Sequence, residues 1–389
     1  MEKTNDKLRK LLTKIDNKQS IKVAIFGLGS VGNYLLNFLL DYSDKDMQII
    51  VVGRDNKKLE QDLNIATVAA SIRGTLKSKT YFKKLDFNNI DELTNFFQEE
   101  KPDFVVNSSR AYSGIKYGSI SWHNIRAYGI WTPLSISIIK NIMIAHKESN
   151  SNAIVINTSY SDAVNAWLKS SDLNYPDFGS GNLNHLIPRI KFAVTKLLNL
   201  DYSEKVDVII STSHFHDVVI SKEGQTENIN PLLKILVNDK EVDIDHNKIY
   251  KLCAISMPTD QKRNMMNASS NFEIITKILN ALKYRKEEIF HSPGVFGNIG
   301  GFPIIINGEN CSIKFYEQYF SLEEMKKHNL NSIYLDGIEN IDNSFLIYTD
   351  ELLKKVKDIF NVDLPKKVHF NDIENIAKLL IEKVIRANI

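Results

Sequence analysis

Cysteine is scarce in this sequence, and its scarcity argues against two kinds of architecture. Only 2 of the 389 residues are cysteine, Cys253 and Cys311, and they lack the Cys-x-x-Cys spacing of a metal or redox site. A disulfide framework needs more cysteines than this, and a structural zinc site needs ligands at close spacing. We therefore expect a reduced protein, and we predict no metal site.

Long apolar runs and an excess of one charge are also absent. No stretch approaches the ~18 consecutive apolar residues of a membrane span, and the charged first ten residues lack the apolar core of a signal peptide. A formal net charge of +2 offers no general attraction to nucleic acid or to an anionic membrane. The sequence therefore predicts a cytoplasmic globular protein that acts on a small molecule, without nucleic-acid or membrane partners.

One stretch has the pattern of a nucleotide-binding turn. The apolar run 23–26 predicts a buried strand, Gly27, Gly29 and Gly32 follow with the spacing G-x-G-x-x-G, and residues 33–40 continue with helical periodicity. In such a turn the first glycine allows the tight bend, the second lets a diphosphate approach the backbone, and the third lets helix and strand pack closely. We interpret it as a dinucleotide site, and a purely structural turn is the alternative.

The diphosphate of such a site lies at the N-terminus of the helix that follows the glycine turn, because unpaired backbone N–H groups point outward there. Ser30 and Val31 occupy this position and are predicted to contact the cofactor.

The end of the second predicted strand, residues 47–52, bears on the choice of cofactor. An NAD site usually has an acidic residue there for the ribose hydroxyls, whereas an arginine accommodates the 2′-phosphate of NADP. Gly53 stands where the acid is expected, and Arg54 follows it. We therefore favour NADP over NAD. Asp55 comes later and is equally suited to cap the next helix.

Strands and helices alternate as far as residue 157, which predicts a doubly wound parallel α/β sheet. We divide the chain into an N-terminal helix (1–20), a nucleotide-binding domain (21–157) and a substrate-binding α+β domain (158–389) with additional C-terminal helices. The strand predicted near residues 103–109 ends on the nicotinamide side in folds of this kind. Asn107 and Ser108 are therefore predicted cofactor ligands.

A long segment, residues 110–133, follows that strand without a clear periodic pattern. It is rich in Gly, Tyr, Trp, Arg and Lys, and long loops of this kind are usually functional. We interpret it as a substrate-covering loop, and a packed contact between domains or subunits is the alternative. Arg110 and Arg126 are candidates for binding an anionic substrate.

The order of motifs resembles the lactate/malate dehydrogenase superfamily. Residues 156–162 stand where that family has a strand ending in Asn-Pro, and residues 177–184 are similar to its Gly-x-Gly-x-x-Leu-Asp segment. Residues 206–219 carry His-Phe-His-Asp where the family has His-Gly-Asp. The resemblance implies a Rossmann-type sheet followed by an α+β domain, an NAD(P)-dependent dehydrogenase, and a homo-dimer or homo-tetramer.

The same resemblance implies roles for particular residues. His214 or His216 stands in the place of the general acid/base of hydride transfer, although either is also suited to a structural role or to joint metal binding. Asn184 stands where the family has its catalytic Asp, and Arg189 is the guanidinium nearest to the family's substrate-binding Arg. Asn157 corresponds to the family's nicotinamide-side Asn.

Asn182 and His185 lie in or beside the same glycine-containing segment and are further candidates for substrate binding. Three other functions stay open. The chain could be an opine- or saccharopine-type dehydrogenase, which reduces an imine, or a non-catalytic nucleotide-binding sensor or structural protein. A family 4 glycoside hydrolase is disfavoured because no cysteine stands near this segment to hold its metal.

Overall fold

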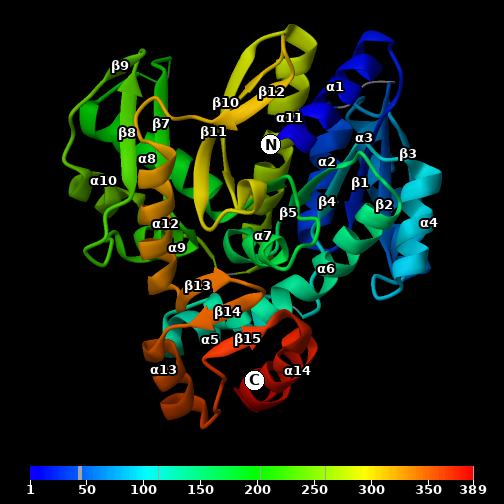
Figure 1. The fold of residues 1–389 in the computed structure, drawn as a ribbon. Coiled ribbons are helices and arrows are strands. Elements are labelled where there is room, and N and C mark those ends of the chain that lie inside the picture. Colours follow the sequence, from blue (N-terminus) through cyan, green and yellow to red (C-terminus); the bar gives the residue numbers. More distant parts are fainter. Residues whose placement is uncertain (43–45, 113, 202, 259, 389) are drawn as a thin grey trace.

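The core of the fold is a parallel sheet, as predicted, and it has six strands (Figure 1). The computed structural model describes residues 1–42, 46–112, 114–201, 203–258 and 260–388. The strands lie in the order β3-β2-β1-β4-β5-β6. Their bounds are β1 (Ile21–Phe26), β2 (Met47–Gly53), β3 (Lys79–Lys84), β4 (Phe104–Asn107), β5 (Ile154–Asn157) and β6 (Phe178–Gly179). This is the strand order of a dinucleotide-binding fold.

Alternate residues of the central strands belong to two different cores, because successive side chains of a strand point to opposite faces. Ala24 and Phe26 pack with α4 (Ile90–Glu100) and α6 (Thr132–Glu148). Val23 and Ile25 lie in the opposite core. The helices of that core are α1 (Glu2–Asp16), α2 (Ser30–Tyr42), α3 (Asn56–Ile72) and α11 (Asn264–Tyr284).

The second half of the chain adds three antiparallel sheets, two of which lie beside the parallel one (Figure 1). A third core joins the first of these sheets to three helices. Its elements are β7 (Val206–Ser211), β8 (Leu232–Val237), β9 (Lys240–Glu241), α8 (Asn182–Leu198), α9 (His214–Glu223) and α10 (His246–Cys253). The other sheet consists of β10 (Glu287–Pro293), β11 (Gly301–Asn307) and β12 (Ser312–Phe315), and it packs beside α11.

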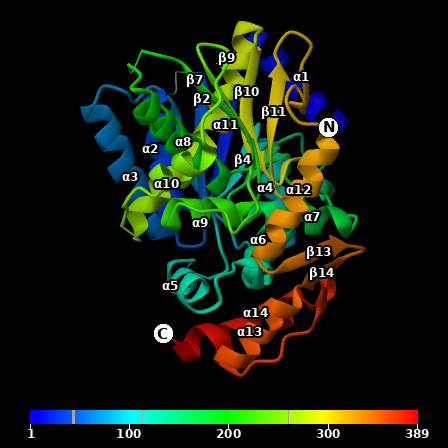
Figure 2. The same ribbon diagram turned by 90° about the vertical axis from the view of Figure 1, so that its left-hand side faces the viewer.

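The C-terminal part lies at the lower end of the molecule in both views and packs against α6 (Figures 1 and 2). It follows α12 (Leu322–Leu335), and its two predicted helices correspond to α13 (Asp350–Phe360) and α14 (Ile373–Leu379). The sequence did not predict its small sheet, which consists of β13 (Ile338–Asp342), β14 (Phe345–Tyr348) and β15 (Lys367–His369). We call residues 338–388 the C-terminal module. Ile389, the last residue of the second predicted helix, lies outside the described residues.

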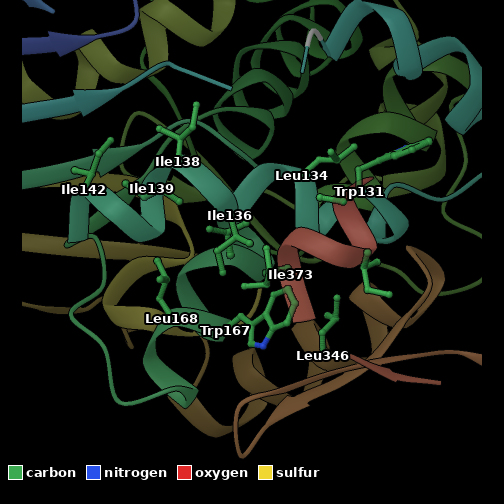
Figure 3. Packing of buried hydrophobic residues seen from close by; sticks show 14 of the residues in the cluster. Trp131, Leu134, Ile136, Ile138, Ile139, Ile142, Trp167, Leu168, Leu346 and Ile373 are labelled. Carbon is green, nitrogen blue, oxygen red and sulfur yellow. The ribbon is translucent and has the colours of Figure 1, made fainter. Parts of the chain in front are cut away.

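The C-terminal module shares a core with the nucleotide-binding sheet. Leu346 and Ile373 are fully buried in the same cluster as Ile136 of α6 and Trp167 of α7 (Ser161–Ser170), as Figure 3 shows. The indole N–H of Trp167 donates to the Ser344 carbonyl at 3.0 Å. The module is therefore held to the rest of the chain by continuous apolar packing.

One expectation about local structure is wrong. Residues 110–133 were expected to lack regular structure, but they contain α5 (Gly114–Ile120), a π-helical turn (Ser121–Ile125) and a 3₁₀ turn (Gly129–Trp131). Burial of apolar side chains such as Ile125 and Ile130 folds this segment locally. Ser113 lies outside the described residues. His214 and His216 follow the end of β7 and lie in the first turn of α9.

The sheet continues past residue 157, where we placed a domain boundary, because β6 pairs with β5. The division into domains stays a prediction. Within the described ranges, no helix is long and apolar enough to cross a membrane.

Candidate functional site

A cavity of about 550 Å³ lies at the carboxyl ends of the parallel strands. The chain reverses its direction of travel through the sheet between β1 and β4, and ligands of such sheets bind beside that point. Eight of the predicted site residues line the cavity: Gly29, Ser30, Val31, Ser108, Arg110, Asn182, His185 and His214. Several residues of the segment 110–133 also line it, which supports the interpretation of that segment as part of a substrate site.

The three glycines of the turn have different surroundings. Gly27 has a φ of +93°, a conformation that side chains disfavour. A Cβ on Gly32 would lie 2.2 Å from the Gly27 carbonyl oxygen, so the helix packs tightly onto the turn there. A Cβ on Gly29 would meet no atom within 4 Å. Gly29 therefore leaves open space at the cavity wall, where a diphosphate can approach the backbone.

The residues after β2 lie outside this cavity. Arg54 is exposed and has no ion pair with any described residue, so its guanidinium is free to meet a phosphate. The Asp55 side chain accepts from the Lys58 backbone N–H at 3.0 Å and caps α3. Asp55 therefore caps α3, which is the role that the sequence analysis considered for it.

Asn107 and Asn157, both predicted to bind the cofactor, are fully buried and do not line the cavity. The Asn107 amide donates to the Asn157 side-chain oxygen at 3.0 Å, and the Asn157 amide donates to Asn165 at 3.1 Å. The first bond joins the ends of β4 and β5, and the second joins β5 to α7. The two residues therefore order the strand ends, and the Asn157 amide uses its second N–H on the Ser159 carbonyl.

His214 lies at the cavity wall and is paired with a carboxylate. Its Nδ1 lies 3.0 Å from an Asp336 carboxylate oxygen, and its backbone N–H donates to Asp162 at 3.0 Å. The imidazole also contacts the rings of Tyr128 and Tyr160, with centroids 4.8 and 5.0 Å away. Because Nδ1 is bonded, Nε2 is the ring nitrogen left for a ligand.

The charges of neighbouring carboxylates determine the direction in which the pKa of His214 shifts. Burial lowers its pKa, but the neighbouring carboxylates, with Asp336 first, outweigh burial and raise the pKa above its ordinary value. A raised pKa favours the protonated imidazole, the form that can donate a proton.

His216 lies two residues away and faces the protein interior. It is fully buried, its Nδ1 lies 2.6 Å from Ser332 Oγ, and its Nε2 is bonded to the Ile229 carbonyl. Burial lowers its pKa to about 4. Both ring nitrogens are therefore occupied, so His216 is structural and shares no ligand with His214.

Asp336 is fully buried and joins three separate parts of the chain. Besides His214, it accepts from the Tyr160 hydroxyl at 2.6 Å and from the Tyr128 backbone N–H at 2.7 Å. Tyr160 has a φ of 44°, which is unusual for a side-chain-bearing residue and is typical of functional sites. These bonds fix the carboxylate, and through it the ring of His214.

Two further carboxylates face the cavity near His214. Asp162 opens α7, and Asp217 follows His214 by three residues on α9, so both flank the imidazole. Burial raises the pKa of each to about 6, although the charge of His214 opposes this rise. Neither has an ion pair with Lys or Arg within 4.0 Å in the described structure.

Asn184 and Arg189, the predicted catalytic pair on α8, are buried away from the cavity. The Asn184 amide donates to Glu273 at 3.2 Å and to the His291 carbonyl at 3.1 Å. The Arg189 guanidinium donates to the Cys253 carbonyl at 2.9 Å. Both side chains are engaged in packing α8, so the geometry does not give them the roles that the resemblance implied.

Arg126 also lies away from the cavity, unlike Arg110. It forms ion pairs with Glu223, at 2.6 Å, and with Glu227, and its guanidinium lies over the Trp122 ring. Its charge is thus already neutralised, so it is not free to bind a substrate.

Sequence reasoning missed Asp336, Tyr128, Tyr160 and Arg263, which all border the site. Asp336 stands 122 residues after His214, with no motif around it, so no local pattern pointed to it. Tyr128 lay within the aromatic segment that had been noticed as a whole. Among the residues that the structure describes, no three His, Cys, Asp or Glu side chains are grouped to hold a metal ion.

One family model matches part of this chain, and solved structures match its fold. Residues 23–117 match the model of the saccharopine dehydrogenase NADP binding domain. This range contains the glycine turn, Arg54 and Ser108. No curated protein matches the chain.

Among solved structures, the chain is similar to a lactate dehydrogenase of Cryptosporidium parvum complexed with lactic acid and nicotinamide adenine dinucleotide. The identity is 13% and the TM-score 0.53, over 94% of this chain and 99% of that one. The malate dehydrogenase of the same organism has 14% identity and a TM-score of 0.52, over 88% and 100% of the two chains. Plasmodium falciparum malate dehydrogenase with NADH has 14% identity and a TM-score of 0.50, over 80% and 95%.

At identities this low, the likeness concerns the fold alone. The predicted fold class, a Rossmann-type sheet followed by an α+β half like that of lactate and malate dehydrogenases, is confirmed.

Proposed function

We propose that this protein is an NAD(P)-dependent oxidoreductase that acts on the carbonyl or hydroxyl carbon of a small anionic substrate. The observation that carries the proposal is one cavity lined both by the open glycine turn at Gly29 and by His214. Asp336 holds Nδ1 of that histidine at 3.0 Å. A nucleotide site and a paired imidazole on one cavity are the two parts that reversible hydride transfer needs.

The residues at the cavity fit a nicotinamide dinucleotide. Gly29, Ser30 and Val31 would hold its diphosphate at the N-terminus of α2. When bound, the nicotinamide would accept or supply the hydride at its C4 carbon. His214 would donate its Nε2 proton to the substrate oxygen during reduction and take it back during oxidation. Asp336 would keep the ring oriented and stabilise its protonated form.

A titration of NADPH and NADH, followed by nicotinamide fluorescence, tests this proposal. We expect both to bind, and NADPH to bind roughly tenfold or more tightly because Arg54 is a free guanidinium at the end of β2. Arg54→Ala should abolish the difference and leave NADH binding unchanged. Lys57→Ala removes a nearby exposed charge and serves as the control. If neither nucleotide binds, the glycine turn is structural and the proposal fails.

Asp162 and Asp217 favour a second candidate, an opine- or saccharopine-type dehydrogenase. Two buried carboxylates beside His214, without a Lys or Arg partner, suit a substrate whose reacting carbon carries an amine. The family model matched by residues 23–117 agrees with this candidate. NADPH oxidation by a 2-oxo acid alone would support the first candidate. Oxidation that also requires an added amino acid would support the second.

The remaining parts of the proposal concern catalysis, assembly and location. A non-catalytic sensor would bind nucleotide but turn over no substrate, and its function would survive replacement of His214.

A homo-dimer or homo-tetramer and a cytoplasmic location follow from the resemblance and from the composition of the chain. Sedimentation velocity on the purified protein tests the assembly.

A further inference from the structure

The cavity contains a guanidinium that the proposed reaction has not yet used. Arg263 immediately precedes α11, is partly buried and lines the cavity. It has no ion pair or side-chain hydrogen bond with any residue in the described ranges. Asp260, which also lines the cavity, uses its carboxylate to accept from the Lys262 backbone N–H at 2.8 Å. Arg263 is therefore a cation in a cavity without a protein partner.

The position of Arg263 is fixed by its helix. The side chain of Asn264, the next residue, donates to Ser30 Oγ at 2.6 Å and joins the start of α11 to the start of α2. The charge of Arg263 acts on the residues around His214. Burial and, next to it, the charge of Arg263 lower the pKa of His185 to about 3. The same charge also favours a lower pKa for Asp217. Arg263 lines the same cavity as His185, His214 and Asp217.

His185 gives a second, independent sign of a ligand at this place. It lines the cavity, is 7% exposed, and its Nε2 has no hydrogen-bond partner within 3.5 Å in the described structure. The Met266 backbone is close enough to oppose the fall in the pKa of the ring, although it makes no hydrogen bond within that distance. Its Nδ1 lies 4.0 Å from Asp217, beyond hydrogen-bond distance. A buried polar atom without a partner costs free energy, and a ligand would supply the partner.

We propose that Arg263, with His185 beside it, binds a carboxylate of the substrate and thereby orients the reacting carbon toward His214. A guanidinium presents paired N–H donors that match a carboxylate. Arg189 cannot take this part because it is buried and bonded to the Cys253 carbonyl. Arg110 lines the cavity from the segment that follows Ser108, on the side of the glycine turn. The inference rests on the proposed function, since it assigns the substrate end of the same cavity.

Calorimetric titration with malonate, a small dicarboxylate, tests the assignment on the protein saturated with NADPH. We expect Arg263→Leu to raise the malonate Kd roughly 10- to 100-fold, the loss that accompanies a charge-assisted hydrogen bond. Arg263→Lys keeps the charge without the paired donors and should give a smaller rise. Lys262→Ala removes the adjacent exposed charge and should leave the Kd unchanged. Malonamide, the neutral analogue, should bind at least tenfold more weakly than malonate.

Four results would overturn the assignment. The first is an unchanged malonate Kd in Arg263→Leu, and the second is a failure of malonate to bind the unchanged protein. The third is a malonamide Kd equal to that of malonate. The fourth is an Arg263→Leu variant in which the Kd values of NADPH and of malonate rise by the same factor. The last result would assign Arg263 to the cofactor diphosphate. If NADPH fails to bind the unchanged protein, the proposed function fails separately, and malonate titration without nucleotide still decides the role of Arg263. Thermal unfolding of each variant checks that it is folded.

Discussion

His214 and His216 lie two residues apart on α9, yet they contact different parts of the molecule. One faces the cavity and shares its proton with Asp336, and the other is bonded on both nitrogens inside the protein. The pKa of the first is raised and that of the second is lowered to about 4. Position on the helix thus gives two residues of the same type different surroundings and opposite pKa shifts.

Replacing each histidine by asparagine should separate these roles. His214→Asn should lower turnover ~10²- to 10⁴-fold, the usual contribution of general acid–base catalysis, with nucleotide binding retained. His216→Asn should reduce stability by ~1–3 kcal/mol, because Ser332 or the Ile229 carbonyl loses a partner, with turnover per folded molecule retained. Steady-state kinetics and thermal unfolding measure the two effects. Equal loss of turnover in both variants would contradict the assignment.

Asp336 should influence stability in a pH-dependent manner. The pKa of His214 is raised in the folded protein, so the pair stabilises the fold fully below the unfolded pKa of about 6.5. This contribution is lost as the pH rises through the folded pKa. Asp336→Asn should therefore lower Tm more at pH 5.5 than at pH 9, and the pKa of His214 should fall.

Thermal unfolding at both pH values and NMR titration of the His214 ring protons measure these effects. The lost bonds from Tyr160 and Tyr128 would lower Tm equally at both values. A pH-independent decrease in Tm would thus contradict a stabilising charge pair between Asp336 and His214. As a control, Asp342→Asn, at the exposed end of β13, should change Tm little at either pH.

In the element formed by β1, the glycine turn and α2, Gly29 and Gly32 are needed for different reasons. Gly29→Ala adds a methyl group into open space, so the protein should keep its Tm while the nucleotide Kd rises roughly tenfold, because the methyl group blocks the diphosphate. Gly32→Ala places a methyl group 2.2 Å from a carbonyl oxygen and should destabilise the fold by ~1–3 kcal/mol. Unfolding and nucleotide titration of both variants test this contrast. A Gly29→Ala variant that binds nucleotide normally would contradict the assigned site.

The glycine turn and the elements on either side of it were predictable because the residues that define them lie close together in the sequence. The turn spacing, the β-branched strands and the cap at Asp55 are all contained within a few residues. The Asp336 contact joins positions 122 residues apart, and Arg263 reaches the cavity only because α11 packs beside α2. The resemblance to a known family correctly indicated the fold, and the role that it implies for His214 stays a prediction. The resemblance could not show that the side chains of Asn184 and Arg189 are buried and bonded inside the protein, because these contacts depend on how distant elements pack against α8.

At the scale of the whole molecule, the segment that joins α12 to the C-terminal module supplies Asp336 to the site from outside the nucleotide-binding sheet. Asp336 stands just before β13, and the module that follows is packed into the core that lines one face of the sheet. The position of the carboxylate at His214 therefore depends on the docking of residues 338–388. Because the apolar cluster is continuous, the module and the sheet should unfold together.

Leu346→Ala tests this dependence, since Leu346 is fully buried between the module and the sheet helices. The change should cost ~2–5 kcal/mol and lower a single unfolding transition, with equal calorimetric and van't Hoff enthalpies. Ile359→Ala is a matched control, because Ile359 is 43% exposed on α13 of the same module and should change stability by less than ~0.5 kcal/mol. If Leu346→Ala instead produced an early separate transition, the module would be an independent unit. In that case turnover would be lost at the first transition, while nucleotide binding would persist to the second.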